Sequence, residues 1–164
     1  MEACGALGSL AGAEFLARTT DGGATWRSVG PAAGSFNAGF YGTSAAMVVA
    51  WGSSTTTTYS TQDGGSRWAT GGSSGYEEGD TVVDLLSPSS AFFLAGAAGN
   101  ARPLTGDLYR TTDTGAHWAK VSSPQAGGKP FGGCIAFRDG RLGWTTSALA
   151  PARRAAAVAG GRHR

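Results

Sequence analysis

The densest group of chemically active side chains in the sequence is the run Tyr76-Glu77-Glu78-Gly79-Asp80. Cleavage of a glycosidic bond uses two carboxyl groups, one of which acts as general acid. Glu77, Glu78 or Asp80 could serve in such chemistry, although a charged run of this kind is more often a solvated turn, the reading that we favour. Further residues that could contact a ligand on the same face are Arg102, Lys129 and Phe131.

Other catalytic and metal-binding patterns do not occur in the sequence. His117 and His163 have no partner at the spacing of a metal site or a catalytic triad. Cys4 and Cys134 match no metal motif, and they could either form a disulfide or remain two small apolar thiols. The glycine-rich stretches lack the strand, loop and helix context of a phosphate-binding loop. We therefore predict no metal site and no cofactor.

The composition indicates short strands joined by many turns. The chain has 164 residues, of which 28 are Gly, and 41% are hydrophobic while only 15% are charged. This length suits one domain, and the aromatic and β-branched content argues against disorder. No apolar run reaches the roughly 18 residues that a membrane helix requires, so we expect no transmembrane segment.

The net charge of +2 comes from the end of the chain, where four arginines lie within the last twelve residues. Residues 1–152 hold nine Lys or Arg against eleven Asp or Glu. This part of the chain carries slightly more acidic than basic residues, so it is not expected to have the basic surface that binds nucleic acid. We therefore expect no nucleic-acid partner.

Three segments repeat the pattern T-x-D-x-G-x-x-W, and their Asp residues are 42 and 50 positions apart. This period fits a four-stranded propeller blade. In each segment the Asp carboxylate can accept backbone N–H bonds across a hairpin turn, the Thr hydroxyl can add a local bond, and the Gly supplies a positive φ. The Trp is expected to be buried at an equivalent core position in each repeat. The residues with these structural roles are Thr19, Asp21, Gly23 and Trp26; Thr61, Asp63, Gly65 and Trp68; Thr111, Asp113, Gly115 and Trp118.

The segments around each repeat predict an all-β fold. Residues 80–122 read as one blade, with strands near 81–86, 92–95, 108–112 and 118–121. Residues 36–70 predict a second blade, while 14–29 predict the last two strands of a blade and 133–147 the first two. Together these strands make about three blades, whereas a closed propeller needs at least four. We therefore predict a partial β-propeller whose open strand edges favour self-association or aggregation.

The repeats closely resemble the Asp-box, or BNR, repeat family, over about residues 14–147. This family includes sialidases, xyloglucanase-like glycoside hydrolases, sortilin-type receptors and photosystem II assembly factors. Residues 108–113 and 137–144 look most like the assembly-factor and bacterial branch. The resemblance implies a β-propeller fold and an extracytoplasmic location. The start of the chain lacks the basic and apolar regions of a signal peptide, so the compartment stays open.

The last part of the chain differs in composition. We expect residues 1–147 to form the partial propeller and residues 148–164 to be an Ala- and Arg-rich tail, either disordered or read out of frame in a truncated gene. A functional basic tail that binds an acidic surface is the alternative. Ala and Arg favour helices, so a weak helix is also compatible with this segment.

The resemblance implies two functions. The first is a non-catalytic scaffold that binds an unknown protein or saccharide, and the second is a fragment of a sialidase- or xyloglucanase-like glycoside hydrolase. We favour the scaffold, because the sequence lacks the opening motif and arginine triad of sialidases and offers no convincing carboxylate pair. Ligand-binding residues are expected on the face opposite the repeat turns, in loops that include 71–79, 96–107 and 123–132.

Overall fold

The computed structural model describes these segments of the chain: residues 16–31, 34–51, 56–73, 81–95, 106–122, 125–126, 129–130 and 135–145. They consist of strands, turns and irregular segments, without a helix in any described range. In the part of the chain that the structure describes, there is accordingly no helix of the length and hydrophobicity that crossing a membrane requires.

Fourteen strands occur in the described segments. Their bounds are β1 (Ala17–Arg18), β2 (Arg27–Ser28), β3 (Ser35–Tyr41), β4 (Ala45–Trp51), β5 (Thr56–Thr61), β6 (Ala69–Thr70), β7 (Thr81–Leu85), β8 (Ala91–Ala95), β9 (Asp107–Thr111), β10 (Ala119–Ser122), β11 (Gln125–Ala126), β12 (Lys129–Pro130), β13 (Ile135–Phe137) and β14 (Gly143–Thr145).

Two complete sheets follow the chain as antiparallel meanders. The second blade has the order β3-β4-β5-β6 and the third blade the order β7-β8-β9-β10. The pair β1-β2, here called the first half-blade, precedes them, and the pair β13-β14, the fourth half-blade, follows them. The central strands β4 and β8 are nearly continuous apolar runs because both of their faces are buried, whereas the outer strand β10 is exposed.

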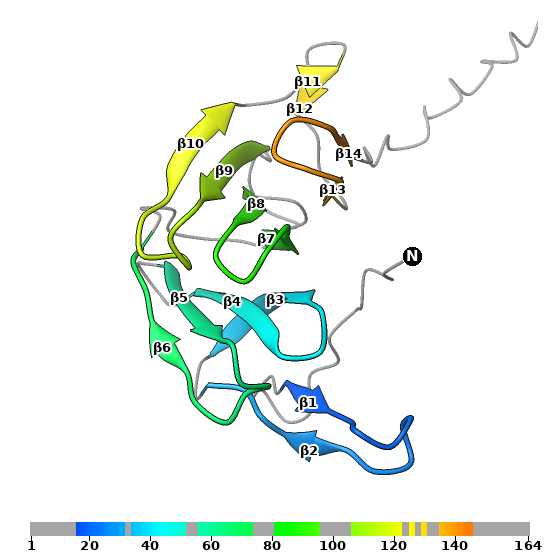
Figure 1. Cartoon of the computed structure of the whole chain (residues 1–164). Coiled ribbons are helices and arrows are strands. Elements are labelled where there is room, and N and C mark those ends of the chain that lie inside the picture. Colours follow the sequence, from blue (N-terminus) through cyan, green and yellow to red (C-terminus); the bar gives the residue numbers. More distant parts are fainter. Residues whose placement is uncertain are drawn as a thin grey trace, which may run out of the picture.

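The sheets stand side by side in a crescent, with β1-β2 at one end and β13-β14 at the other (Figure 1). The first strand of each complete blade lies toward the concave side, and the last strand lies toward the convex side. Strand β7 contacts both β3 and β13. This is the arrangement of neighbouring blades in a β-propeller, and the predicted all-β, partial-propeller fold is confirmed.

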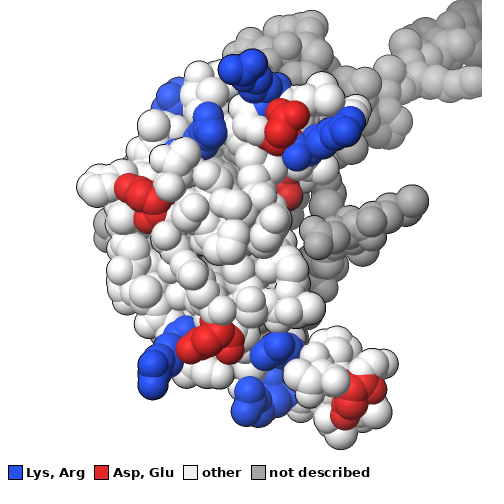
Figure 2. Space-filling view, in the orientation of Figure 1, with Lys and Arg blue, Asp and Glu red and all other residues white. Residues whose placement is uncertain are grey.

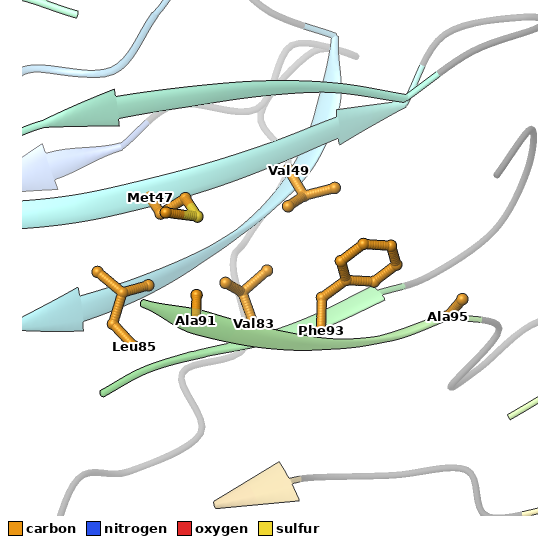
Figure 3. Close-up of a cluster of buried hydrophobic side chains, with 7 residues drawn as sticks. All are labelled: Met47, Val49, Val83, Leu85, Ala91, Phe93 and Ala95. Atoms are coloured by element: carbon orange, nitrogen blue, oxygen red, sulfur yellow. The ribbon is translucent and has the colours of Figure 1, made fainter. Parts of the chain in front are cut away.

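The core lies between the blades. Figure 3 shows side chains of β4 facing those of β7 and β8 across the gap between the second and third blades. The residues of this cluster are Met47, Val49, Val83, Leu85, Ala91, Phe93 and Ala95. Phe93 is fully buried and stacks on Tyr109 at 4.6 Å, while Trp118 meets its ring edge-on at 4.7 Å. Burial of one such side chain stabilises a fold by roughly 1.5–3 kcal/mol.

Equivalent clusters fill the other two gaps. Leu16, Phe36, Val48 and Ala50 pack between the first half-blade and the second blade. Between the third blade and the fourth half-blade, the cluster consists of Phe92, Leu94, Leu108 and Ile135. Each blade therefore buries one face against the preceding unit and the other against the following one.

The two innermost strands of the complete blades approach each other closely at Gly39 of β3. A Cβ atom at this position would lie 2.8 Å from Leu85 Cδ1 and 2.9 Å from the Val83 carbonyl oxygen. A side chain at position 39 would collide with β7, so glycine is required at this contact.

Charged side chains gather toward the edges of the face in Figure 2, and the middle of that face is mostly uncharged. This distribution agrees with sheets that bury apolar residues against one another and place charges in turns and on outer strands.

One segment differs from the sequence prediction. Residues 123–132 were expected to be a loop, but β11 and β12 pair there as a short hairpin. The sequence between these strands is Gly127-Gly128, a signal for a two-residue hairpin turn. The tail at 148–164, the first fifteen residues, Cys4 and Cys134 lie outside the described residues.

Candidate functional site

Most of the loop residues predicted to contact a ligand cannot be placed. Tyr76, Glu77, Glu78, Asp80, Arg102 and Phe131 lie outside the described residues. Lys129 lies in β12, where its backbone pairs with Ala126. Their grouping on one face therefore stays a prediction.

The repeat turns share one hydrogen-bonding arrangement, which the second turn illustrates. Asp63 Oδ1 accepts the Thr61 hydroxyl at 2.9 Å and the Arg67 backbone N–H at 3.0 Å. The Thr61 hydroxyl oxygen in turn accepts the Gly65 N–H at 3.0 Å. Because these bonds connect both sides of the turn, the carboxylate holds it closed.

The first and third turns repeat these bonds. Asp21 accepts the backbone N–H of Thr25 at 2.9 Å, and Asp113 accepts that of His117 at 3.0 Å. Thr19 and Thr111 donate their hydroxyls to these carboxylates at 2.8 and 2.7 Å. The arrangement is the same at all three sites, so it belongs to the repeat and not to a single ligand site.

These bonds stabilise the ionised carboxylates. The side-chain and backbone bonds from Thr25 lower the pKa of Asp21 to about 2, and the backbone and side-chain bonds from His117 lower that of Asp113 to about 2. The Arg67 N–H and the Thr61 hydroxyl lower the pKa of Asp63. Carboxylates of this kind are ionised at neutral pH, and a general acid needs the opposite shift.

The turns also place two consecutive residues at positive φ. The repeat glycines Gly23, Gly65 and Gly115 have φ of 96°, 85° and 81°. In the first two turns the preceding residue is also glycine, but in the third it is Thr114, with φ of 66°. A β-branched residue in this region is strained, so the third turn holds its shape at a conformational cost.

The remaining described carboxylates also have protein partners. Asp84 accepts the backbone N–H of Phe137, which joins the third blade to the fourth half-blade. Asp107 pairs with Lys120 at 2.8 Å. Asp139 accepts the N–H groups of Arg141 and Leu142 in the β13–β14 turn, and these bonds lower its pKa.

An open cleft of about 510 Å³ lies between the first half-blade and the second blade. Strand β1 and Leu16 form one wall, and the β3–β4 hairpin forms the other. Its apolar lining includes Leu16, Trp26, Phe40, Ala46 and Trp68. Phe40 is 48% exposed although it lies on a strand that packs between blades. This cleft is the strongest candidate binding site in the described residues.

Arg18 of β1 spans the cleft. Its guanidinium donates to the Thr43 carbonyl oxygen at 3.0 Å and to the Gly64 carbonyl oxygen at 3.3 Å, both in the second blade. The arginine therefore supports the wall of the cleft and places a cation at its edge.

The tryptophans of the repeats explain why this end of the molecule is open. Trp68 donates its indole N–H to the Val29 carbonyl oxygen, and Trp118 donates to the Thr58 hydroxyl, so each is anchored on the preceding blade. Among the described residues, Trp26 donates its indole N–H to Gly23 of its own turn and to no preceding blade, and it is 64% exposed. The prediction of three equivalently buried tryptophans is wrong for Trp26, since no blade precedes it in the described segments.

A second hollow of about 620 Å³ lies between the repeat turns of the second and third blades. Most of its lining residues are polar or charged, and they include Asp63, Arg67, Thr70, Asp113 and Thr114. Both carboxylates are the turn residues described above. In the described ranges, no three His, Cys, Asp or Glu side chains are grouped so that they could hold a metal ion.

The chain is similar to a solved structure titled "YCF48 bound to D1 peptide", with 23% sequence identity and a TM-score of 0.49. The similarity covers 65% of this chain and 33% of that one, so this chain spans about a third of the length of its structural neighbour. No protein-family model and no curated protein matches the chain.

Proposed function

We propose that the chain is a non-catalytic propeller module of the Asp-box, or BNR, type, which binds a protein by taking up a strand-forming segment in the cleft beside β1. The single observation that carries this proposal is the combination of an apolar cleft with a strand edge along it. Among the branches of the repeat family, the photosystem II assembly-factor-like scaffolds best match such a role.

Strand β1 supplies the backbone part of the recognition. In the described residues β1 pairs only with β2, so its other edge faces the cleft. An extended segment laid along this edge would gain main-chain hydrogen bonds, while its alternate side chains would reach the apolar lining. Phe40 and Trp68 offer aromatic surface to those side chains.

The described carboxylates support a binding role over catalysis. Asp21, Asp63, Asp113 and Asp139 have lowered pKa values because they accept turn hydrogen bonds. A glycoside hydrolase needs one carboxyl group that remains protonated near neutral pH. Hydrolysis of a fluorogenic sialoside or of a xyloglucan oligosaccharide by the chain would favour the glycoside hydrolase alternative.

A saccharide is the second candidate ligand. The hollow between the repeat turns of the second and third blades offers ionised carboxylates and hydroxyls to sugar hydroxyl groups. Glycan-array binding that is lost in Arg67→Ala and retained in Phe40→Ser would favour this candidate and place it in the hollow.

The test of the protein-binding proposal compares two neighbours on β3. Phe40 lines the cleft, whereas Tyr41, of similar exposure at 44%, is not part of its lining. Displayed peptides of about six residues, the usual strand length, should be enriched for alternating apolar residues when selected on the chain. Phe40→Ser should weaken the selected peptides by roughly tenfold, ~1.4 kcal/mol, while Tyr41→Ser should not. Equal binding by both variants would overturn the proposal.

A further inference from the structure

We infer that the cleft receives the β13-β14 hairpin of a second copy of this chain, so that two copies close a six-bladed ring. This inference rests on the proposed function and names the partner of the same site. The half-blades are complementary: β1-β2 supplies the third and fourth strands of a blade, and β13-β14 supplies the first and second. Joined, they would reproduce the order of the two complete blades.

The complete blades define the register of this pairing. In the third blade Ala91 pairs with Leu85 on one side and with Thr111 of the repeat turn on the other. In the fourth half-blade Gly143 pairs with Phe137 across a hairpin of the same length, so it occupies the position of Ala91. Gly143 would therefore pair with Thr19, the equivalent of Thr111, in the second copy.

The next pair in this register is Trp144 with Arg18 of the second copy. It corresponds to Phe92 with Arg110 in the third blade. There, the Arg110 guanidinium lies over the Phe92 ring, 5.5 Å from its centroid. The same cation–π contact would form between the two copies.

Trp144 has the chemistry that the cleft accepts. Its equivalent in the third blade, Phe92, is 2% exposed and packs toward the following unit, whereas Trp144 is 61% exposed. In the composite blade Trp144 would point toward the second blade of the other copy, where Phe40 and Ala46 line the cleft. The cleft volume of about 510 Å³ accommodates an indole ring.

Arg110 provides an independent indication. Arg18 bonds to two carbonyl oxygens of the following blade, those of Thr43 and Gly64. The Arg110 guanidinium lies beside Gly140, the equivalent of Thr43, with its Nη2 3.0 Å from where a Cβ of Gly140 would be. In the ring, Gly22 of the second copy would occupy the position equivalent to Gly64.

The other end of the interface is also apolar. Val29 is partly buried beneath Trp68, which bonds to its carbonyl oxygen. Val121, three positions after Trp118, is the extra residue of a β-bulge between Lys120 and Ser122 at the corresponding end of β10, and it is 53% exposed. Trp26 of the second copy would cover Val121, and both exposed side chains would then be buried.

Pairing of these two half-blades with each other requires two copies. If β14 paired with β1 of the same chain, the ring would have three blades, fewer than the four of the smallest propellers. In the crescent of Figure 1 these two strands lie at opposite ends. Two copies related by a two-fold axis form the pairing twice and close six blades, within the range of known propellers.

Disulfide trapping tests the register directly. In a Cys4→Ser, Cys134→Ser background, an Ala17→Cys chain is mixed with a differently tagged Thr145→Cys chain under mild oxidation, because the same register opposes these two positions and leaves Arg18 and Trp144 in place. Directly opposed residues of antiparallel strands are close enough for a disulfide, so a mixed dimer should form. Thr20→Cys is the control, because it lies three residues from Ala17, about 10 Å along an extended chain, and it should not cross-link. Equal cross-linking of Thr20→Cys, or none with either, would overturn the inference.

Light scattering on the unmodified chain gives the second measurement. A monodisperse species of twice the 16.4 kDa chain mass is expected, and Trp144→Ser should dissociate it while Tyr41→Ser should not. A folded monomer or heterogeneous aggregates would overturn the ring. A monomer that still binds peptides through Phe40 would retain the proposed function without this partner, whereas loss of both dimer and peptide binding would reject both.

Discussion

The indole Nε1 of Trp118 donates a hydrogen bond of 2.8 Å to the hydroxyl of Thr58, a residue 60 positions earlier in the chain. Thr58 lies on the third strand of the second blade and is only 2% exposed. This hydrogen bond connects side chains of the second and third blades. It lies in the interface that also contains Phe93.

Removing the Thr58 hydroxyl should therefore weaken the contact between blades. Thr58→Val keeps the side-chain volume but leaves the Trp118 N–H without its acceptor, which should lower the free energy of unfolding by roughly 1–3 kcal/mol. Denaturant unfolding followed by tryptophan fluorescence measures the change. Thr57→Val, on the same strand but more exposed, is the control and should cost much less; equal losses would contradict the role of the bond.

The hydroxyl of the repeat threonine should matter most where the turn is buried. Thr111 is 2% exposed, and its oxygen accepts the buried N–H of Gly115 at 3.1 Å. Thr111→Val should cost roughly 1–3 kcal/mol, because a buried donor loses its partner. Thr19→Val removes the same bond from the more exposed first turn, where water can replace it, and should cost less. A reversed order in the chemical-denaturation midpoints would refute this account.

The lowered pKa of Asp113 predicts an acid-sensitive contribution to stability. Bonds from His117 lower the pKa of the folded state from 3.8 to about 2, so the unfolded chain binds the proton more readily. The contribution is fully present above about pH 4 and is lost as the pH falls toward 2. Asp113→Asn should therefore be less stable than the natural chain at neutral pH, and the difference should narrow between pH 4 and 2. A pH-independent difference would show that the charge is not the source.

The two central residues of the third turn should respond in opposite directions. Thr114→Gly relieves a positive φ that costs roughly 1–2 kcal/mol, partly offset by about 0.4–1 kcal/mol from the freer unfolded chain. A net stabilisation of about 0.5–1 kcal/mol is expected. Gly115→Ala should destabilise by about 2 kcal/mol or more, because φ is 81° and the new Cβ would lie 2.4 Å from Thr58 Cγ2. Thermal unfolding of both variants decides, and a stable Gly115→Ala would disprove the steric argument.

Much of the fold could be predicted from the sequence because its signals are local. The T-x-D-x-G-x-x-W pattern marks a turn and therefore the strands on both sides, and in the third blade β7 and β9 begin or end within one residue of the predicted bounds. The β11–β12 hairpin was missed because it is short and lies between repeats, although Gly127-Gly128 was a usable signal.

The candidate site could not be predicted in the same way. The cleft depends on which neighbour covers a residue, and Trp26 and Trp68 have the same local sequence context but different exposure. Phe40 likewise lies in an apolar strand, and nothing in its neighbours reveals that it faces open space. The acidic run at residues 76–80, which the sequence analysis considered for catalysis, lies in a segment whose sequence contains no repeat turn.

The close approach at Gly39 has a consequence for the curvature of the crescent. On the concave side, Gly39 of β3 has no side chain and lies close to β7. Farther from the concave side, the side chains of Thr58 and Trp118 lie between the same two blades. The spacing between the two blades is therefore smallest on the concave side and larger toward the convex side. This difference in spacing sets the curvature of the crescent. The curvature therefore depends on the residue volumes along the interface, and at this curvature position 39 has room only for glycine.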